Sequence, residues 1–360
     1  MIENSNQYVI SGISAITSVG GNAAQTCTAI HAKIIGVGKH SLYRCKPLYP
    51  NEEKAFPLFC SRVPFVAEEQ VGAERLLQLA VPALREVVAN AKLDSTELAY
   101  GKLLLALPVR DSLTASWRLE DAFVPNLCQR AGIYPIAQWQ VKFGGRTSVF
   151  ELLAEACQAL EQGECEFCIV GGVDSFLFKH RLDELDQNWL LRSKKNVDGF
   201  IPGEAASFIF VEKAANANRR GVSSLARIDA VAVGEEPNSA DTGRKSSGVG
   251  LTNAIQQVAT GQARQFKTVY SDLNGESYLA FEWGLAQVRA LDHLNPSFEL
   301  LHPAECYGDV GAATGALLLT LAAYDLRPKE YAPPKRQPAL LFASSLNRDA
   351  RAAASLSAIE

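Results

Sequence analysis

The stretch GGRTSVFELLAEACQAL (residues 144–160) predicts a helix that starts after a polar turn with two glycines. Ser148 and Glu151 have the spacing of a capping box, in which the serine hydroxyl accepts a hydrogen bond and the glutamate reaches back. Apolar residues then recur at helical spacing on one face, namely Phe150, Leu153, Cys157 and Leu160. The sequence therefore predicts a helix over 148–162 with one buried face and Ser148 as its N-cap.

Strand-like and helix-like patterns alternate along the rest of the chain. Strands are predicted within 9–21, 102–109, 168–176, 207–213, 225–233, 268–275, 298–305 and 338–347, and helices over 22–33, 74–91, 249–264, 279–293 and up to Asp325. This alternation predicts an α/β protein with mainly parallel sheets. Polar, glycine-bearing turns at 144–148 and 308–315 each precede an interior helix, a weak repeat that favours a layered pseudo-dimer. The predicted halves are 1–215, with an irregular insertion at 40–63, and 222–360.

The bulk composition of the 360 residues excludes several function classes. Hydrophobic residues make up 48% and charged residues 21%, with a net charge of −4, as in ordinary soluble proteins. Lysine and arginine are not concentrated, so we expect no nucleic-acid partner. The longest apolar run, 316–324, is too short to span a bilayer, and the N-terminus lacks a secretory core. We therefore expect a cytoplasmic protein without a membrane segment.

The eight cysteines include one CxxC motif, Cys165 and Cys168. A structural zinc site would need a second pair or a nearby histidine, and neither is present in the sequence around the motif. Cys168 also lies in the strand-like run FCIVGG, so core packing is the simpler interpretation. No metal and no cofactor are expected.

Two loops combine polar residues with glycine at places where ligands bind in α/β proteins. DLNGE (272–276) follows an apolar strand, so Asp272, Asn274 and Glu276 either bind a ligand or form an Asx turn with Gly275 at a positive φ. CYGDVGAATG (306–315) precedes a helix and could hold an anion. Its Asp309 would repel an anion, however, and an N-cap role for this residue is the simpler account.

A basic loop is the third candidate site. It contains Lys194 and Lys195, with Lys179, Arg181 and Arg192 upstream. These residues could form a landing surface for an acidic partner. A solvated basic loop is the more frequent explanation of such a run.

Five segments in order resemble the β-ketoacyl synthases, the condensing enzymes of the thiolase fold, over roughly 9–349. They are VISGISAITSVGGNAAQTCTAI, ACQALEQGECEFCIVGGVDSF, VDGFIPGEAASFIFVEK, VYSDLNGE and YGDVGAATGALLLTLAA. The resemblance implies an α/β thiolase-like fold, with two βαβαβαββ halves stacked as αβαβα layers, and a dimer. The DLNGE…EWG and ECYGDVGAATG segments also resemble, more faintly, thiolase-like proteins encoded beside type VI secretion effectors and adaptors.

The same resemblance implies that the reactive residues of the family are replaced. Its cysteine nucleophile falls on Arg146, its first histidine on Asn274 and its second on Asp309, while its lysine falls near Ala304. The glycine-rich loop of the oxyanion hole reads SSLNRD (344–349) and contains no glycine. Condensation needs a thiolate to accept the acyl group and imidazoles to stabilise the oxyanion, so we expect this chemistry to be lost.

A polar pocket with no catalytic residue is the expected remnant of that site. Its predicted members are Arg146, Thr147, Ser148, Asn274, Glu276, Asp309 and Asn347, with Arg348 or Asp349 as further candidates. If they converge, Arg146 and Asp309 would form a partly buried ion pair.

Three functions are compatible with this pattern. The first is a non-catalytic, dimeric accessory or scaffold protein, which in type VI secretion would bind an effector or adaptor. The second is a chain-length-factor-like partner of an active ketosynthase, working with an acyl carrier protein. The third is an acyl-thioester enzyme with altered chemistry that uses Asp309, Glu276 or Asp272 as acid or base. This third function predicts an open pocket and a strongly shifted carboxylate pKa.

Overall fold

Two five-stranded sheets, each with the same internal order, form the frame of the protein. The computed structural model describes residues 7–45, 56–93, 96–110, 114, 117, 119–133, 136, 138–194, 196–259, 266–328, 337–345 and 349–359. The first sheet has the order β5-β4-β6-β7-β1, from β1 (Tyr8–Ile16), β4 (Gly101–Leu107), β5 (Gln138–Phe143), β6 (Phe167–Ser175) and β7 (Glu204–Lys213). The second has the corresponding order β10-β9-β11-β12-β8, from β8 (Ala226–Glu235), β9 (Phe266–Ser271), β10 (Leu294–Leu301), β11 (Ala339–Ser344) and β12 (Ala350–Ser357).

The strand directions repeat between the two sheets. In each sheet three strands are mutually parallel (β5, β4, β6 and β10, β9, β11), and the other two join antiparallel. The sheets are therefore mixed and not mainly parallel as predicted: β7 and β12 run opposite to the other four strands of their sheets, and five of the nine strand pairings are antiparallel. The sheets join where β1 and β8 pair over Tyr8–Ile10 and Ala226–Ile228. Beyond these residues the two strands separate.

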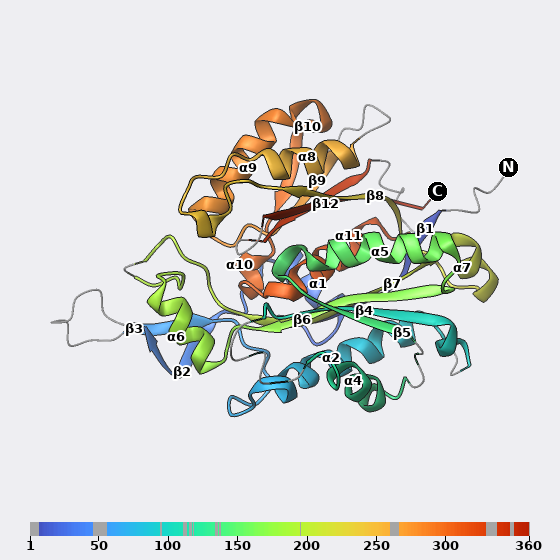
Figure 1. Ribbon diagram of the computed structural model, residues 1–360, viewed down its shortest axis with the longest axis horizontal. Helices are drawn as coiled ribbons and strands as arrows, with labels where there is room; N and C mark the ends of the chain where they lie inside the picture. The colour runs from blue at the N-terminus through green and yellow to red at the C-terminus, as the bar shows by residue number, and fades with distance from the viewer. Residues whose placement is uncertain are drawn as a thin grey trace.

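Five layers result from the way helices cover the two sheets (Figure 1). The middle layer contains α5 (Ser148–Gln162), α11 (Thr314–Leu326) and α1 (Ala23–His31). One outer layer has α2 (Gly72–Asn90) and α4 (Phe123–Ala131), and the other has α8 (Val249–Val258) and α9 (Ser277–Arg289). This αβαβα stack is the thiolase-like arrangement that the resemblance implied.

The central helix α11 is buried almost all round because both sheets pack on it. All of its residues except Tyr324 are buried, and its sequence TGALLLTLAAYDL is apolar on every face. A helix that is apolar on all sides is expected in the interior of a protein. The core around it includes Val149, Phe150 and Leu153 of α5, so α5 and α11 are fixed side by side.

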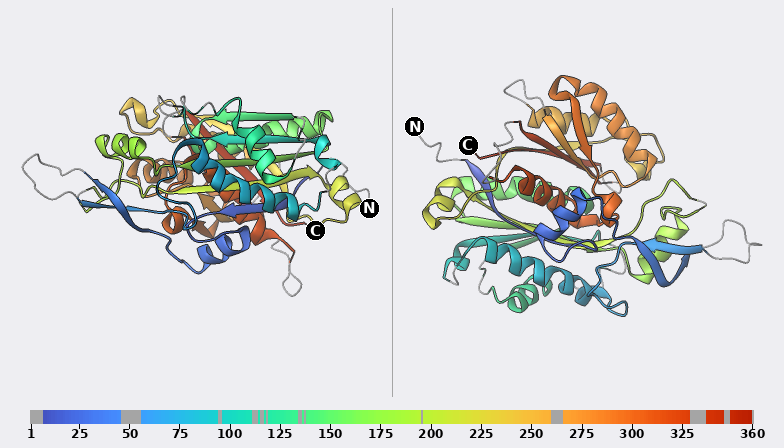
Figure 2. Two further views of the ribbon diagram at one scale, coloured as in Figure 1. Left: turned by 90° about the horizontal axis from the view of Figure 1, so that it is seen from below. Right: turned by 180° about the vertical axis from the view of Figure 1, so that it is seen from behind.

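A two-stranded ribbon with an adjacent helix projects from one end of the layered body (Figure 2). It consists of β2 (Gly38–Cys45) and β3 (Phe56–Cys60), beside α6 (Lys179–Gln187). Cys45, Leu58 and Leu182 belong to its small apolar core. This ribbon lies where the sequence predicted an irregular insertion. Two short helices, α7 (Ala214–Arg220) and α10 (Ala304–Tyr307), also belong to the fold. No helix in the described ranges is long and apolar enough to cross a membrane.

Candidate functional site

Polar side chains from three loops converge beside the start of α5. Arg146 lies in a 3₁₀ turn, η2 (Gly145–Thr147), between β5 and α5. Asn274 and Glu276 lie between β9 and α9, and Asp309 lies between α10 and the 3₁₀ turn η5 (Gly311–Ala313) that leads into α11. The two halves of the chain thus contribute opposite charges to one site at the ends of the two central helices.

The guanidinium of Arg146 is at the centre of this site and is only 7% exposed. Its Nε donates to Asp309 Oδ1 at 3.3 Å, and its Nη2 donates to Asp309 Oδ2 and, at 3.3 Å, to Glu276 Oε2. Its Nη1 donates to the Ser344 carbonyl at 3.5 Å. Two guanidinium nitrogens therefore bind one carboxylate, a fork geometry that lysine cannot reproduce.

Asn274 connects the two carboxylates. Its Nδ2 donates to Glu276 Oε2 at 2.7 Å and to Asp309 Oδ2 at 2.8 Å. Its Oδ1 accepts the Glu276 N–H at 3.1 Å, and Gly275 has φ +108°. The loop therefore contains the Asx turn and the positive-φ glycine that the sequence offered as one of two alternatives. The asparagine amide is fully used inside the site.

Asp309 caps a turn and does not cap the helix that was predicted to follow it. Its Oδ1 accepts the Gly311 N–H at 2.9 Å, at the start of η5. The helix α11 begins only at Thr314, so the predicted N-cap role is wrong by several residues. The backbone of Asp309 is also fixed, since its N–H donates to the Ile201 carbonyl and its own carbonyl accepts the Gly203 N–H, both at 2.8 Å.

Close packing of backbone on backbone holds η5 in place. A Cβ atom added to Gly172 of β6 would lie 2.2 Å from the Ala312 carbonyl oxygen, and one on Gly203 would lie 2.4 Å from the Tyr307 carbonyl oxygen. Contacts this short do not occur between real atoms. Only glycine at these two positions allows the loop that carries Asp309 to approach β6 and β7 so closely.

Burial and the surrounding charges shift the pKa values of the site in opposite directions. Burial lowers the pKa of Arg146, but the carboxylates of Asp309 and Glu276 outweigh it and raise the pKa above its ordinary value. Burial raises the pKa of Asp309, but Arg146 and the amide donors outweigh it and hold the pKa below its usual value. Burial raises the pKa of Glu276, and Arg146 opposes this rise only in part. Arg146 therefore lies between two carboxyl groups, and its closer partner is Asp309.

Asp272 is the one carboxyl of the site with a pKa near neutrality. Burial raises its pKa to about 7, and Arg146 and the Ser344 N–H oppose the rise only in part. Its Oδ2 accepts the Ser344 N–H at 2.7 Å, while its Oδ1 has no partner among the described residues. An acid with such a pKa could in principle exchange protons near neutral pH.

The space beside Asp272 is too small for a substrate. The cavity has a volume of about 10 Å³, and Asp272, Asn274, Asp309, Tyr307 and Thr314 are among its lining residues. Such a volume holds about one water molecule. A water there would also satisfy the unpaired oxygen of Asp272. Ligand pockets are usually about 300 Å³ or larger, so this site is closed.

The start of α5 differs from the predicted capping box. The N-cap residue is Thr147, and Ser148 is the first helical residue, with a buried hydroxyl that has no partner within the described part of the chain. Thr147 Oγ1 donates to Glu151 at 2.9 Å and lies 2.8 Å from Ser345 Oγ. Ser345 Oγ also donates to the Gly144 carbonyl at 2.9 Å. Ser148 is one position too late to cap the helix because η2 already continues into it.

A second buried ion pair next to the site was missed by sequence reasoning. Arg351 Nε donates to both carboxylate oxygens of Glu282, at 2.8 and 2.9 Å, and both residues are fully buried. Ser344 Oγ donates to Glu282 at 2.6 Å, and Ser246 Oγ donates to it at 2.7 Å. This pair fixes β12 to α9 and holds the Ser344 segment against Arg146. Glu282 belongs to the quoted EWG segment, but Arg351 lies in no quoted segment, so no sequence signal identified the pair.

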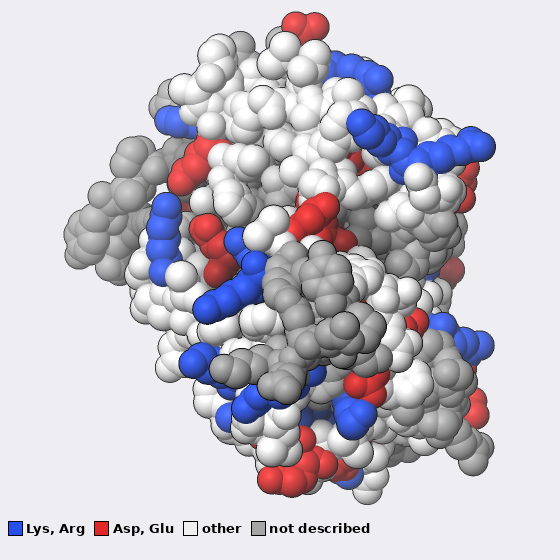
Figure 3. Space-filling view, turned by 90° about the vertical axis from the view of Figure 1, so that its left-hand side faces the viewer, with Lys and Arg blue, Asp and Glu red and all other residues white. Residues whose placement is uncertain are grey.

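The predicted basic surface divides into separate environments. Arg181 is buried and donates to Asp174 at 2.6 Å and to the Ser175 carbonyl at 2.7 Å, so its assignment to a partner surface is wrong. Lys179 is exposed and pairs with Asp183 at 2.6 Å. Arg192 and Lys194 are exposed. In Figure 3 blue and red side chains are interspersed on this face, outside the grey atoms. Lys195, Asn347 and Arg348 lie outside the described residues.

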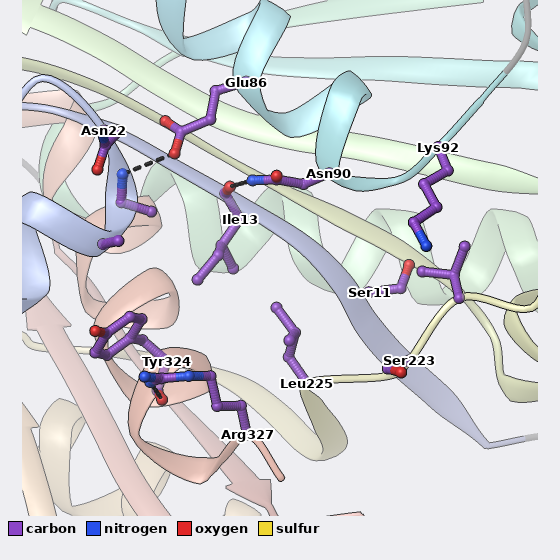
Figure 4. Close-up of a pocket in the computed structure, with 13 residues that line it drawn as sticks. Ser11, Ile13, Asn22, Glu86, Asn90, Lys92, Ser223, Leu225, Tyr324 and Arg327 are labelled. Atoms are coloured by element: carbon purple, nitrogen blue, oxygen red, sulfur yellow. Dashed lines mark hydrogen bonds between the residues drawn. The ribbon is translucent and has the colours of Figure 1, made fainter. Parts of the chain in front are cut away.

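An open groove of about 600 Å³ lies away from the Arg146 site. It lies where β1 separates from β8, and its lining includes Ile13, Leu225, Lys92 and Arg327 (Figure 4). The free edge of β1 is covered there by α2, because Asn90 Nδ2 donates to the Ile13 carbonyl at 2.9 Å. Glu86 of α2 also accepts the N–H of Ala15 in β1 at 3.2 Å, and it accepts the N–H of Ala23, the first residue of α1, at 2.8 Å.

Among the described residues no group of three or more His, Cys, Asp or Glu side chains could hold a metal ion. All eight cysteines and all five histidines lie in the described ranges, and none lines the cavity beside Asp272.

Comparisons with known proteins agree with this architecture. A family model described as "Beta-ketoacyl synthase, N-terminal domain" matches residues 146–217. Searching the curated proteins gives no match. Among solved structures, a chain of AntDE:AntF, a type II polyketide synthase acyl-carrier protein in complex with its ketosynthase bound to the hexaketide, aligns with a TM-score of 0.79. The identity is 13%, and the alignment covers 98% of this chain and 99% of that chain.

Two further solved structures have the same fold. The oxazolomycin ketosynthase domain OzmH KS7 from Streptomyces albus JA3453 aligns with a TM-score of 0.76 and 14% identity, covering 98% of this chain and 75% of that chain. The ishigamide ketosynthase/chain length factor aligns with a TM-score of 0.74 and 13% identity, covering 98% and 99%. Residues 146–217 thus match the β-ketoacyl synthase N-terminal domain, and the chain as a whole has the thiolase-like fold of the solved ketosynthases.

Proposed function

We propose that this protein is a non-catalytic ketosynthase-like protein that acts as an accessory or scaffold subunit. The observation that carries the proposal is the closed site beside α5, in which Arg146 is buried against Asp309 and Glu276. By the resemblance, this is the place of the family's cysteine and histidines. No cysteine or histidine lines its cavity of about 10 Å³.

The chemistry of condensation supports the proposal. The reaction needs a nucleophile that accepts an acyl group and later releases it, and an arginine held in an ion pair does not do this. It also needs donors aimed at a developing oxyanion. Asp309, whose pKa is held below its usual value, carries a negative charge at that place and would repel an oxyanion. The closed cavity also argues against an altered acyl-thioester enzyme that uses Asp272.

The test is a direct search for turnover. The purified protein is incubated with malonyl and acyl thioesters, and CO₂ release, condensed product and the intact mass of the protein are followed. We expect none of the three to change. Turnover that disappears in Asp272→Asn, or a covalent acyl adduct, would contradict the proposal. This variant is chosen because a carboxamide keeps the shape of the side chain and one acceptor oxygen for the Ser344 N–H.

We further propose a homodimer, in line with the resemblance. The strand β5 is the last strand of its sheet, and its first three residues, including Trp139, are exposed. An unpaired edge strand is a ready template for another strand, and a second copy can supply it across a two-fold axis. Light scattering should give the dimer mass for the wild type and the monomer mass for Val141→Pro. A monomeric wild type at micromolar concentration would rule the dimer out.

The identity of the cellular partner would distinguish two forms of the accessory role. We propose a cytoplasmic protein that binds a type VI secretion effector or adaptor, as the faint resemblance suggests. The second candidate is a chain-length-factor-like partner of an active ketosynthase, and the similarity to the ishigamide ketosynthase/chain length factor favours it. Copurification with an active ketosynthase would support the second role and exclude the first. Copurification with an effector or adaptor would do the reverse.

A further inference from the structure

The two cysteines of the CxxC motif lie together at the end of α5, far along the helix from Arg146. Cys165 Sγ and Cys168 Sγ are 3.5 Å apart, and both thiols are free. Cys168 is fully buried at the start of β6, whereas Cys165 is partly exposed in the preceding loop. A disulfide has a sulfur separation of about 2.05 Å, so the two sulfurs are in van der Waals contact and would have to approach by about 1.5 Å to bond. One thiol is open to solvent and the other lies directly behind it.

The surroundings of the pair include a basic residue. Lys102 of β4 lies opposite Cys168 in the parallel register of β4 and β6. Its Nζ is 3.4 Å from Glu164, the residue before Cys165. A nearby cation and a neighbouring thiol that donates a hydrogen bond both stabilise a thiolate. In agreement, the hydrogen bond from Cys168 and the charge of Lys102 lower the pKa of Cys165, although burial opposes this.

The other cysteines of the chain lie in contrasting environments. Burial raises the pKa of Cys157 and Cys60 to about 12, and that of Cys45, Cys128 and Cys306 to about 11. It also raises the pKa of Cys27. The hydrogen bond to Cys165, followed by burial, raises the pKa of Cys168. Cys165 therefore differs from all seven other thiols.

We propose that Cys165 and Cys168 form a thiol–disulfide exchange site that takes a low-molecular-weight disulfide of the glutathione class. The Cys165 thiolate attacks one sulfur of the disulfide, forms a mixed disulfide and releases one thiolate, which takes a proton from water. Cys168 then loses its proton and attacks the Cys165 sulfur, which releases the second small thiol. The two protein thiols are oxidised to one internal disulfide, and the small disulfide is reduced to two thiols. The sequence alone favoured core packing for this motif. The partial exposure of Cys165 in the structure makes one of the two thiols accessible to a small disulfide.

The test follows the fate of one peptide. Trypsin releases residues 147–179 as a single fragment that contains Cys157, Cys165 and Cys168. The reduced, folded protein is treated with oxidised glutathione, quenched by alkylation, digested and weighed. In the wild type the mass of the fragment should show a disulfide between Cys165 and Cys168, which is a loss of two hydrogens, and one alkyl group on Cys157. Cys168→Ser should instead retain glutathione on Cys165, and Cys165→Ser should form neither product.

Two controls keep the test decisive. Cys157→Ser should behave like the wild type, because Cys157 has no part in the exchange. If Cys168→Ser does not fold, the wild type is treated with a limiting maleimide, and Cys165 should react at least about tenfold faster than Cys157. Equal labelling of these two cysteines, or a wild-type fragment that keeps three free thiols, would overturn the proposal.

Discussion

The Arg146 site and the groove beside β1 are opposite in character although both are lined by charged and polar residues. The first has a volume of about 10 Å³ and a buried ion pair, and the second has a volume of about 600 Å³ with Lys92 and Arg327 at its surface. The site where the resemblance would place the condensing residues thus has almost no free space, whereas the groove beside β1 is open. At the Arg146 site the buried charged groups stabilise one another, whereas the polar groups of the groove line an open space.

The strongest test of this contrast removes Arg146. In Arg146→Ala the carboxylates of Asp309 and Glu276 lose their counter-charge in a buried place, so we expect a loss of about 3–5 kcal/mol in the free energy of unfolding. Urea denaturation near neutral pH measures it. Arg327→Ala in the groove is the matched control and should cost about 1 kcal/mol or less, because Arg327 is only half-buried and contacts only the ring and carbonyl of Tyr324 in the described structure. Equal losses in the two variants would contradict the contrast.

Asp272 provides a pH-dependent test. Its folded pKa of about 7 is above the ordinary 3.8, so the folded state binds more protons between these values, and stability is lost as pH rises through this range. Asp272→Asn removes the cost, so the variant should gain up to about 4 kcal/mol over the wild type at about pH 8 and little at about pH 3. Urea denaturation across this pH range gives the difference. A constant difference would show that the carboxyl titrates normally.

Replacing a small lining residue by leucine compares the free space in the closed cavity with that in the groove. Ala304 lines the closed cavity and Ala24 lines the groove. We expect Ala304→Leu to cost about 1–3 kcal/mol, because the surrounding backbone leaves no room for three more carbons. Ala24→Leu should change stability by about 0.5 kcal/mol or less. Thermal unfolding of the two variants distinguishes the cases, and a tolerated leucine at 304 would mean that the site can open.

The smallest expected effect concerns the first turn of α5. Ser148 has a buried hydroxyl with no partner in the described ranges, so Ser148→Ala should leave stability unchanged or raise it by about 1 kcal/mol. Thr147→Ala should lower it by about 1–2 kcal/mol, since Thr147 bonds Glu151 and lies within bonding distance of Ser345. A loss in Ser148→Ala similar to that of a removed N-cap would restore the capping-box interpretation.

Strong periodicity explains which elements could be predicted from the sequence. The helix α5 and the strands β4, β6 and β7 have clear apolar patterns, and they lie close to the predicted ranges. The strand β5 was missed although QWQVKF alternates polar and apolar residues, the pattern of a half-buried strand, because this pattern is only six residues long. The strand β12, ARAAASLS, is rich in alanine and lacks the bulky branched residues typical of buried strands. Pro82 did not end α2, which continues on both sides of it.

Two signals pointed to the site, namely the positions that the resemblance implies and the polar turn after an apolar strand. Arg146, Asn274 and Asp309, implied by the resemblance, and Glu276 of the turn do meet in the structure. Glu282 lies in the EWG segment, but Arg351 is 69 positions away in no quoted segment, so their pairing depends on the packing of α9 against β12. The raised pKa of Asp272 likewise depends on burial, which a turn sequence does not reveal.

The mutual dependence of Arg146, Asp309 and Glu276 restricts the order in which evolution can change them. If Arg146 alone is replaced by cysteine, two buried acids remain without a cation, and if Asp309 alone becomes histidine, two basic groups face each other. Each single substitution is therefore expected to destabilise the protein, so cysteine and histidine could be placed at this site only by several substitutions together. Homologous chains are therefore expected to vary at positions 146, 276 and 309 as a set, and a family in which these positions vary independently would argue against this dependence.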